Sequence, residues 1–113
     1  MELNHLQEGK ITIINIKGRL DAAAASAAGN AIQKIIEGDG LRILFNFNDL
    51  EYLSSSGLKV ILGAAKELRR KDSKFVLCSL NQFVEEIFVV SGINSLIPIT
   101  NDIESGIKLL SLN

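Results

Sequence analysis

The chain has 113 residues, a formal net charge of -1 and 47% hydrophobic residues, which predicts one folded domain spanning residues 1–113. Lys and Arg (12) are balanced by Asp and Glu (13), so the basic excess that favours nucleic-acid binding is missing. The longest uncharged stretch, residues 87–101, contains Gly92 and Pro98 and is shorter than the ~20 mostly apolar residues of a membrane span. No apolar run follows a basic start at the N-terminus, as a secretory signal requires, so we expect a cytoplasmic protein with neither nucleic acid nor membrane as partner.

The first half of the chain predicts a hairpin, a helix and a central strand, in that order. Residues 3–6 and 11–16 are short apolar runs around a turn that contains glycine, which is typical of two antiparallel strands. Apolar residues at helical spacing follow Asp21, the candidate N-cap, and the helix is expected to end at the glycines before residue 41. Residues 41–47 place four apolar side chains on one face of an extended chain and Arg42, Leu44 and Asn46 on the other, which predicts a strand at the centre of the sheet.

The second half repeats the alternation of helix and strand. Apolar residues at helical spacing predict a helix over residues 58–68 and another between Asn81 and Gly92, with a strand over residues 74–80 between them. Strands that alternate with helices through short connections imply right-handed crossovers between parallel strands. The predicted fold is therefore α/β, with a mostly parallel sheet of about five strands, an N-terminal hairpin and about four helices.

The end of the chain gives a weaker strand and a last short helix. Residues 96–100 are the strand candidate, and Pro98 should place this strand at an edge of the sheet because proline lacks a ladder donor. Asn101 and Glu104 have the spacing of a capping box at the start of the final helix.

Few residues suit metal or covalent chemistry. The chain has one His and one Cys and lacks both ligand-spaced clusters and a phosphate-binding glycine loop, so we expect no metal site, no cofactor and no catalytic residue. His5 lies on an exposed face of a predicted strand, and Cys78 lies in an apolar run where a buried reduced thiol is the usual outcome. The basic residues within 66–74 most simply form a solvated helix face, with an acidic partner as the alternative.

One constellation stands out, Ser54-Ser55-Ser56-Gly57, between the predicted central strand and the following helix. Serine is a preferred N-cap, so at least one of the three should accept a hydrogen bond from an early helix N–H. The carboxyl end of a strand in an open α/β sheet also gathers functional groups, and a helix N-terminus attracts anions. An exposed serine there is a candidate nucleophile or phosphoacceptor. The nucleophile interpretation lacks a base, because only His5 is available and no G-x-S-x-G elbow is present.

These serines belong to a longer pattern that resembles the signature of the STAS-domain family of bacterial anti-sigma factor antagonists. The pattern is Asn46-x-x-x-Leu50-x-Tyr52-Leu53-Ser54-Ser55-Ser56-Gly57-Leu58-x-Val60-Ile61-Leu62-Gly63. The family carries an aromatic residue, an apolar residue and Asp-Ser-Ser-Gly-Leu at the matching positions. Gly18-x-Leu20-Asp21, residues 75–78 and residues 87–93 are similar to further family motifs in the same order, so the resemblance covers essentially the whole chain.

The resemblance implies a binding module without enzymatic activity. Its partner would be an anti-sigma factor that is also a serine kinase, and docking would free the sigma factor for transcription. The kinase would phosphorylate one serine at the start of the second helix and so separate the complex, and a serine phosphatase of the metal-dependent class would reset the switch. By position the phosphoacceptor is Ser55, with Ser56 as the second serine of the pair.

Two further positions of the family pattern are acidic, and this chain keeps one of them and changes the other. Asp21 keeps an acidic position of the family, while Ser54 stands where the family has Asp. The remaining implied contacts lie in the first turn of the second helix. The predicted partner-binding residues are Asp21, Ser54, Ser56, Gly57, Leu58 and Lys59.

Charge arithmetic predicts that a phosphate acts on the interface and leaves the fold intact. It adds about -1.5 to -2 charges, and a helix N-terminus stabilises it by only ~0.3–1 kcal/mol. A partner carboxylate ~5 Å away, at an effective dielectric constant of ~20, would instead repel each unit of charge by about 3 kcal/mol. That repulsion weakens binding ~100-fold.

A second interpretation is a structural STAS subunit of a lipid-type ABC transporter or of a larger signalling assembly, with a serine loop that docks and is not phosphorylated. Ser54 in place of Asp favours this interpretation, whereas Ser55, Ser56 and Gly57 favour the switch.

Overall fold

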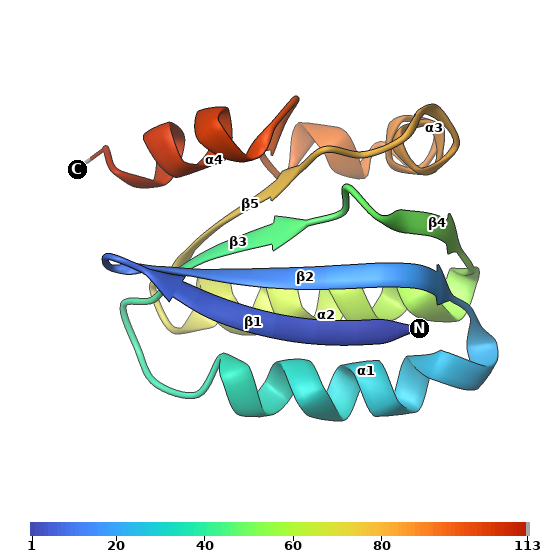
Figure 1. Cartoon of the computed structure of the whole chain (residues 1–113), viewed down its shortest axis with the longest axis horizontal. Helices are drawn as coiled ribbons and strands as arrows, with labels where there is room; N and C mark the ends of the chain where they lie inside the picture. The colour runs from blue at the N-terminus through green and yellow to red at the C-terminus, as the bar shows by residue number, and fades with distance from the viewer. Residues whose placement is uncertain (113) are drawn as a thin grey trace.

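The computed structural model describes residues 1–112 and alternates strands with helices after an N-terminal hairpin (Figure 1). The elements are β1 (Glu2–Glu8), β2 (Ile11–Leu20), α1 (Ala22–Ile35), β3 (Arg42–Asn46), β4 (Leu50–Leu53), α2 (Ser55–Arg70), β5 (Lys74–Cys78), α3 (Gln82–Val90), the 3-10 turn η1 (Ile93–Ser95), β6 (Ile99–Thr100) and α4 (Ile103–Leu110).

The strands form one sheet in the order β1-β2-β3-β5-β6, with β4 paired to β2 off this path. β1 runs antiparallel to β2, and every other pair is parallel. The mostly parallel sheet with an N-terminal hairpin is thus confirmed, as are the central place of β3 and the edge position of β6. The sheet has six strands, where the sequence indicated about five.

The extra strand, β4, depends on the length of β2. The ten residues of β2 pair with β3 over residues 12–15 and with β4 from Gly18 to Leu20. The register shifts next to Gly18, whose φ of 87° is unfavourable for residues with a side chain. The sequence prediction lacked β4 because four residues directly after a turn show too little periodicity.

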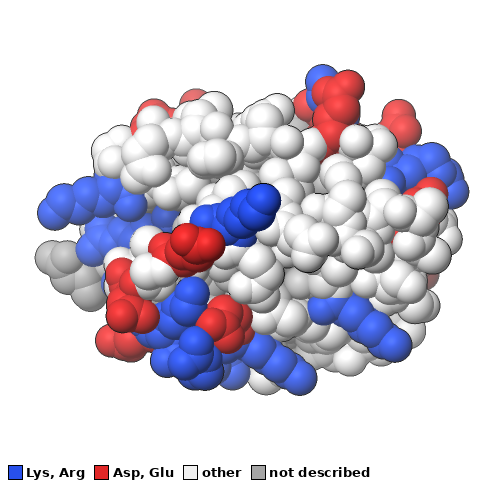
Figure 2. Space-filling view, turned by 90° about the horizontal axis from the view of Figure 1, so that it is seen from below, with Lys and Arg blue, Asp and Glu red and all other residues white. Residues whose placement is uncertain are grey.

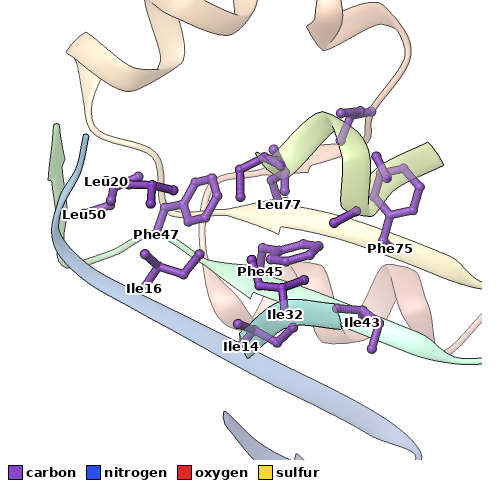
Figure 3. Close-up of a cluster of buried hydrophobic side chains, with 14 of the residues drawn as sticks. Ile14, Ile16, Leu20, Ile32, Ile43, Phe45, Phe47, Leu50, Phe75 and Leu77 are labelled. Carbon is purple, nitrogen blue, oxygen red and sulfur yellow. The ribbon is translucent and has the colours of Figure 1, made fainter. Parts of the chain in front are cut away.

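Helices cover both faces of the sheet. α1 and α2 lie side by side on one face, and α4 lies on the other (Figure 1). The larger core fills the space between the sheet and the α1/α2 layer, with Phe45 against Ile14 and Ile32 and with Phe47 near Leu20 (Figure 3). A smaller core under α4 contains Ile11, Ile13, Leu44, Val76, Cys78 and Leu110.

Two details at the C-terminal end differ from the sequence prediction. The strand expected over residues 96–100 is reduced to Ile99–Thr100, because η1 and Pro98 precede it. The expected capping box of Asn101 and Glu104 is wrong: α4 is capped by Asp102, whose carboxylate accepts the N–H of Ser105 at 2.7 Å. Asn101 is left in the connection between β6 and α4. None of the helices built by residues 1–112 has the length and apolar character needed to cross a membrane.

Replacement of Phe45 by Ala should lower the free energy of unfolding by about 3–5 kcal/mol, because the ring is fully buried. Phe83→Ala is the matched control: that ring is 52% exposed, and we expect a loss below about 1 kcal/mol. Urea denaturation followed by circular dichroism measures both. Equal losses for the two variants would contradict the core assignment.

Candidate functional site

Two helix N-termini lie next to each other at the carboxyl ends of β2 and β4. β2 and β4 run parallel, and Leu20 pairs with Leu53 at their carboxyl ends. Asp21 and Ser54 follow directly, and they are the N-caps of α1 and α2. The backbone N–H of Ser54 donates to the carbonyl of Leu20 at 3.0 Å, which fixes the two caps side by side.

This geometry corrects one expectation. The sequence predicts the serines after the central strand of residues 41–47, but in the structure they follow β4. Because β4 pairs with β2 and not with β5, the serines lie beside Asp21.

The Ser54 hydroxyl makes two hydrogen bonds that anchor the start of α2. It accepts the N–H of Gly57 at 3.1 Å, which confirms the expectation that one of the three serines caps the helix. It also donates to the Leu20 carbonyl at 3.3 Å. A carboxylate can accept the first bond but has no proton for the second. Ser54 therefore caps α2, as an Asp at this position could, and adds a link to β2.

Ser55 and Ser56 occupy the first two positions of α2. Ser55 is exposed, and Ser56 is half-buried. At the first helical positions the backbone N–H groups point out of the helix end, so the surroundings of Ser55 favour negative charge. Of the three serines, Ser55 is the one whose side chain is open to an incoming protein.

Asp21 is held in place by its capping bond. Its carboxylate accepts the N–H of Ala24 at 3.1 Å, which confirms the expected N-cap role. The other carboxylate oxygen lies 3.9 Å from Nε of Arg19, a solvent-screened pair. Asp21 stays half-buried and lines the same end of the molecule as Ser55.

Gly57 is where α2 comes closest to β2. An added Cβ would lie well inside contact distance of the Leu20 carbonyl oxygen and 3.0 Å from Leu53 Cδ1. Gly57 is buried, so its contribution is to let the helix start close to the sheet. The other two predicted first-turn residues differ: Leu58 is half-buried and packs against the main core, while Lys59 is exposed.

Arg19 and Phe83, which the sequence analysis did not single out, form a stack with Tyr52 at the same end of the molecule. The guanidinium carbon of Arg19 lies 4.2 Å from the centroid of the Tyr52 ring. The Tyr52 ring stacks on Phe83 of α3, with centroids 6.0 Å apart and planes inclined by 21°. The residues come from β2, β4 and α3. Phe83 could have been noticed because it lies off the buried stripe of α3, which contains Val84 and Phe88.

The remaining sequence candidates lie elsewhere. Burial raises the pKa of the Cys78 thiol, which disfavours the reactive thiolate. His5 is exposed on β1. Within residues 1–112 no group of three His, Cys, Asp or Glu residues is placed to hold a metal ion.

The basic run near the end of α2 is partly neutralised. Hydrogen bonds from Arg70 lower the pKa of Glu67, which also pairs with Lys71. Most charged side chains of the α1/α2 face gather at the end where these helices finish, and a broad uncharged area covers its middle (Figure 2).

Comparison with known proteins gives matches over nearly the whole chain. The model of the STAS domain matches residues 3–106. BtrV of Bordetella bronchiseptica, named as a candidate anti-sigma factor antagonist, is 33% identical over 104 residues, which cover 85% of this chain and 90% of BtrV. The anti-sigma-B factor antagonist of Listeria monocytogenes is 30% identical over 88 residues, which cover 78% of this chain and 77% of that protein.

A solved structure shows the same fold. The Bacillus cell fate determinant SpoIIAA in its phosphorylated form matches with a TM-score of 0.74 and 22% identity, over 96% of this chain and 99% of SpoIIAA.

Gly57→Ala should lower the free energy of unfolding by about 1–3 kcal/mol, because the new methyl group forces the first turn of α2 away from Leu20. Gly63→Ala is the matched control in the same helix: nothing lies within 4 Å of its added Cβ, so we expect stabilisation of up to about 1 kcal/mol. Thermal unfolding of both variants checks this. If Gly57→Ala were as stable as Gly63→Ala, the close approach would not exist in solution.

Ser54→Ala should cost about 1 kcal/mol of stability, because the cap of α2 is lost. Ser54→Asp keeps an acceptor for the Gly57 N–H, so its stability should lie closer to that of the wild type. Urea midpoints of the three proteins measure the order. A Ser54→Ala midpoint equal to the wild-type value would show that the cap contributes nothing.

Proposed function

The chain belongs to the STAS-domain family, and we propose on that premise that it is an anti-sigma factor antagonist switched by phosphorylation of Ser55. In this proposal the unmodified chain binds an anti-sigma factor that is also a serine kinase, and a metal-dependent serine phosphatase removes the phosphate. The chain acts as a binding module in the cytoplasm, and residues 1–113 act as one domain. The names of its curated relatives support the antagonist role, and the phosphorylated form of SpoIIAA supports the modification.

The observation that carries the proposal is the unequal exposure of the three serines. Ser54 is engaged in two hydrogen bonds that hold α2 to β2, and Ser56 is half-buried. Ser55 is exposed on the first turn of α2, which the Ser54 cap and the close approach at Gly57 keep in place. A kinase needs a hydroxyl that it can reach without unfolding the helix, and Ser55 fits that requirement best.

The surroundings of Ser55 suit a switch at an interface. The phosphate would lie at a helix N-terminus, which tolerates negative charge, so the fold should not change. Asp21 and the phosphate would then present their negative charges to the partner from two adjacent helix starts. A partner surface that accommodates a neutral serine beside Asp21 would be repelled by this added charge.

The proposed contact residues fall into two groups by exposure. Ser55, Lys59 and the exposed edge of Asp21 can touch a partner directly. Ser54, Ser56, Gly57 and Leu58 are buried or half-buried and support the shape of that surface. The replacement of Asp by Ser at position 54 therefore weighs little against the switch, because Ser54 performs the capping role.

Ser55→Asp should weaken binding to the anti-sigma factor at least ~10-fold, because one negative charge is placed in the interface. The probes are the anti-sigma factors of the source organism, purified and titrated one by one by calorimetry. Ser105→Asp is the matched control, since Ser105 is an exposed serine in the first turn of α4, on the other face of the sheet. Unchanged affinity of Ser55→Asp, with a native circular dichroism spectrum, would contradict the switch.

Incubation with ATP and the anti-sigma factor that binds separates the switch from a structural subunit. Mass spectrometry should locate one phosphate on Ser55, and Ser55→Ala should remain unmodified. Phosphate on Ser54 or Ser56 would correct the assigned residue. Binding without any phosphate would favour the structural STAS subunit.

A further inference from the structure

We propose that the docking surface extends from Ser55 onto α3, where a strip of five side chains binds an apolar segment of the same anti-sigma factor. We call Arg19, Tyr52, Phe83, Ile87 and Val90 the α3 strip. The inference rests on the proposed function. It adds a second part of the interface and the chemical character of the partner segment that binds there.

The first part of the α3 strip is a preorganised aromatic stack. The guanidinium of Arg19 covers one side of Tyr52, and Phe83 stacks on Tyr52 with a centroid separation of 6.0 Å. Phe83 is nevertheless 52% exposed. An exposed ring whose rotamer is already fixed loses little conformational freedom when a partner covers it. Tyr and Arg are also the residue types in which binding energy concentrates.

The second part is an apolar hollow along α3. Phe83, Glu86, Ile87, Val90 and Ser91 line a shallow pocket of about 350 Å³. Val90 is 80% exposed, so this helix presents apolar side chains to solvent on the flank next to its buried residues. Exposed apolar side chains grouped along one helix make this hollow a candidate interaction site.

The framework under the α3 strip is rigid. Asn81 caps α3 by accepting the N–H of Val84 at 2.8 Å, and its amide donates to the carbonyl of Leu50 at 2.9 Å. Val84 and Phe88 are completely buried on the inner side of the helix. The outer face of α3 is therefore held in a fixed position relative to β4 and to Ser55, which follows β4.

The small area of α3 and the continuity of the α3 strip with the Ser55 surface indicate which partner covers the strip. α3 has nine residues and is only ~13 Å long, whereas a stable interface buries ~800 Å² on each partner. A second copy that paired through α3 alone would fall well short of that area. The α3 strip instead joins the Ser55 surface directly, because Tyr52 lies three residues before Ser55 and Arg19 lies two residues before Asp21. A protein that covers Ser55 can cover both parts at once.

The charges around the α3 strip indicate the chemistry of the partner segment. Arg19 borders one side of the stack, and Glu86 borders the hollow. An amphipathic segment of the anti-sigma factor with apolar residues facing Phe83 and Val90, and a basic residue facing Glu86, would match both the shape and the charge of this surface.

The test compares Phe83→Ala and Val90→Asp with Leu6→Ala by calorimetry against the anti-sigma factor that binds the wild-type chain. Leu6 is the matched control because it is a 47% exposed apolar residue on β1, away from the α3 strip. We expect both strip variants to bind at least ~10-fold more weakly and Leu6→Ala to bind like the wild type. Unchanged thermal unfolding would show that the variants fold.

The outcomes separate this inference from the proposed function. Weakened binding of Ser55→Asp together with wild-type binding of both strip variants would overturn the α3 strip and leave the switch standing. No binding of the wild-type chain to any anti-sigma factor of the source organism would overturn both. A wild-type dimer in sedimentation velocity that Phe83→Ala dissociates would assign the α3 strip to a second copy and overturn the proposed occupant.

Discussion

The carbonyl oxygen of Leu20 is the point on which the rest of the site depends. It accepts the backbone N–H of Ser54 at 3.0 Å and the Ser54 hydroxyl at 3.3 Å, and it lies directly against Gly57. Only a residue without a side chain fits at position 57. Only a side chain that both donates and accepts can bond to the Leu20 carbonyl and to the Gly57 N–H at once. These contacts join the end of β2 to the beginning of α2. The exposure of Ser55 and its closeness to Asp21 follow from that joint.

The proposed switch requires a rigid joint, because the domain would then carry a phosphate without refolding. The strands beneath the site are fixed by the register of β2 with β4, and the helix is fixed by its cap and by the close approach at Gly57. The backbone around Ser55 therefore has few ways to rearrange when charge is added there. In the proposed switch, the charge of the added phosphate repels the partner and does not strain the fold.

Much of the architecture could be predicted from local patterns. The alternation of apolar segments with periods of two and 3.6 residues indicated the α/β class, and Asp21 and the serine run were visible as helix starts. β4 could not be predicted in the same way, because its four residues become a strand through pairing with the second half of β2. The sequence predicts Asn101 as the cap of α4, but the structure has Asp102. Either residue suits an N-cap, and the choice between them depends on where β6 ends. The stack of Arg19, Tyr52 and Phe83 joins three elements, so its members are visible one by one in the sequence while their contact is not.

In the proposed switch, negative charge on Ser55 acts on the interface and not on the domain. The most direct measurement is a titration of the anti-sigma factor with the chain carrying phosphoserine at position 55, together with amide chemical shifts of the same sample without partner. We predict affinity reduced ~100-fold or more, with shift changes confined to the ends of β2 and β4 and the first turns of α1 and α2. Undiminished affinity, or shift changes spread through the sheet, would contradict the account.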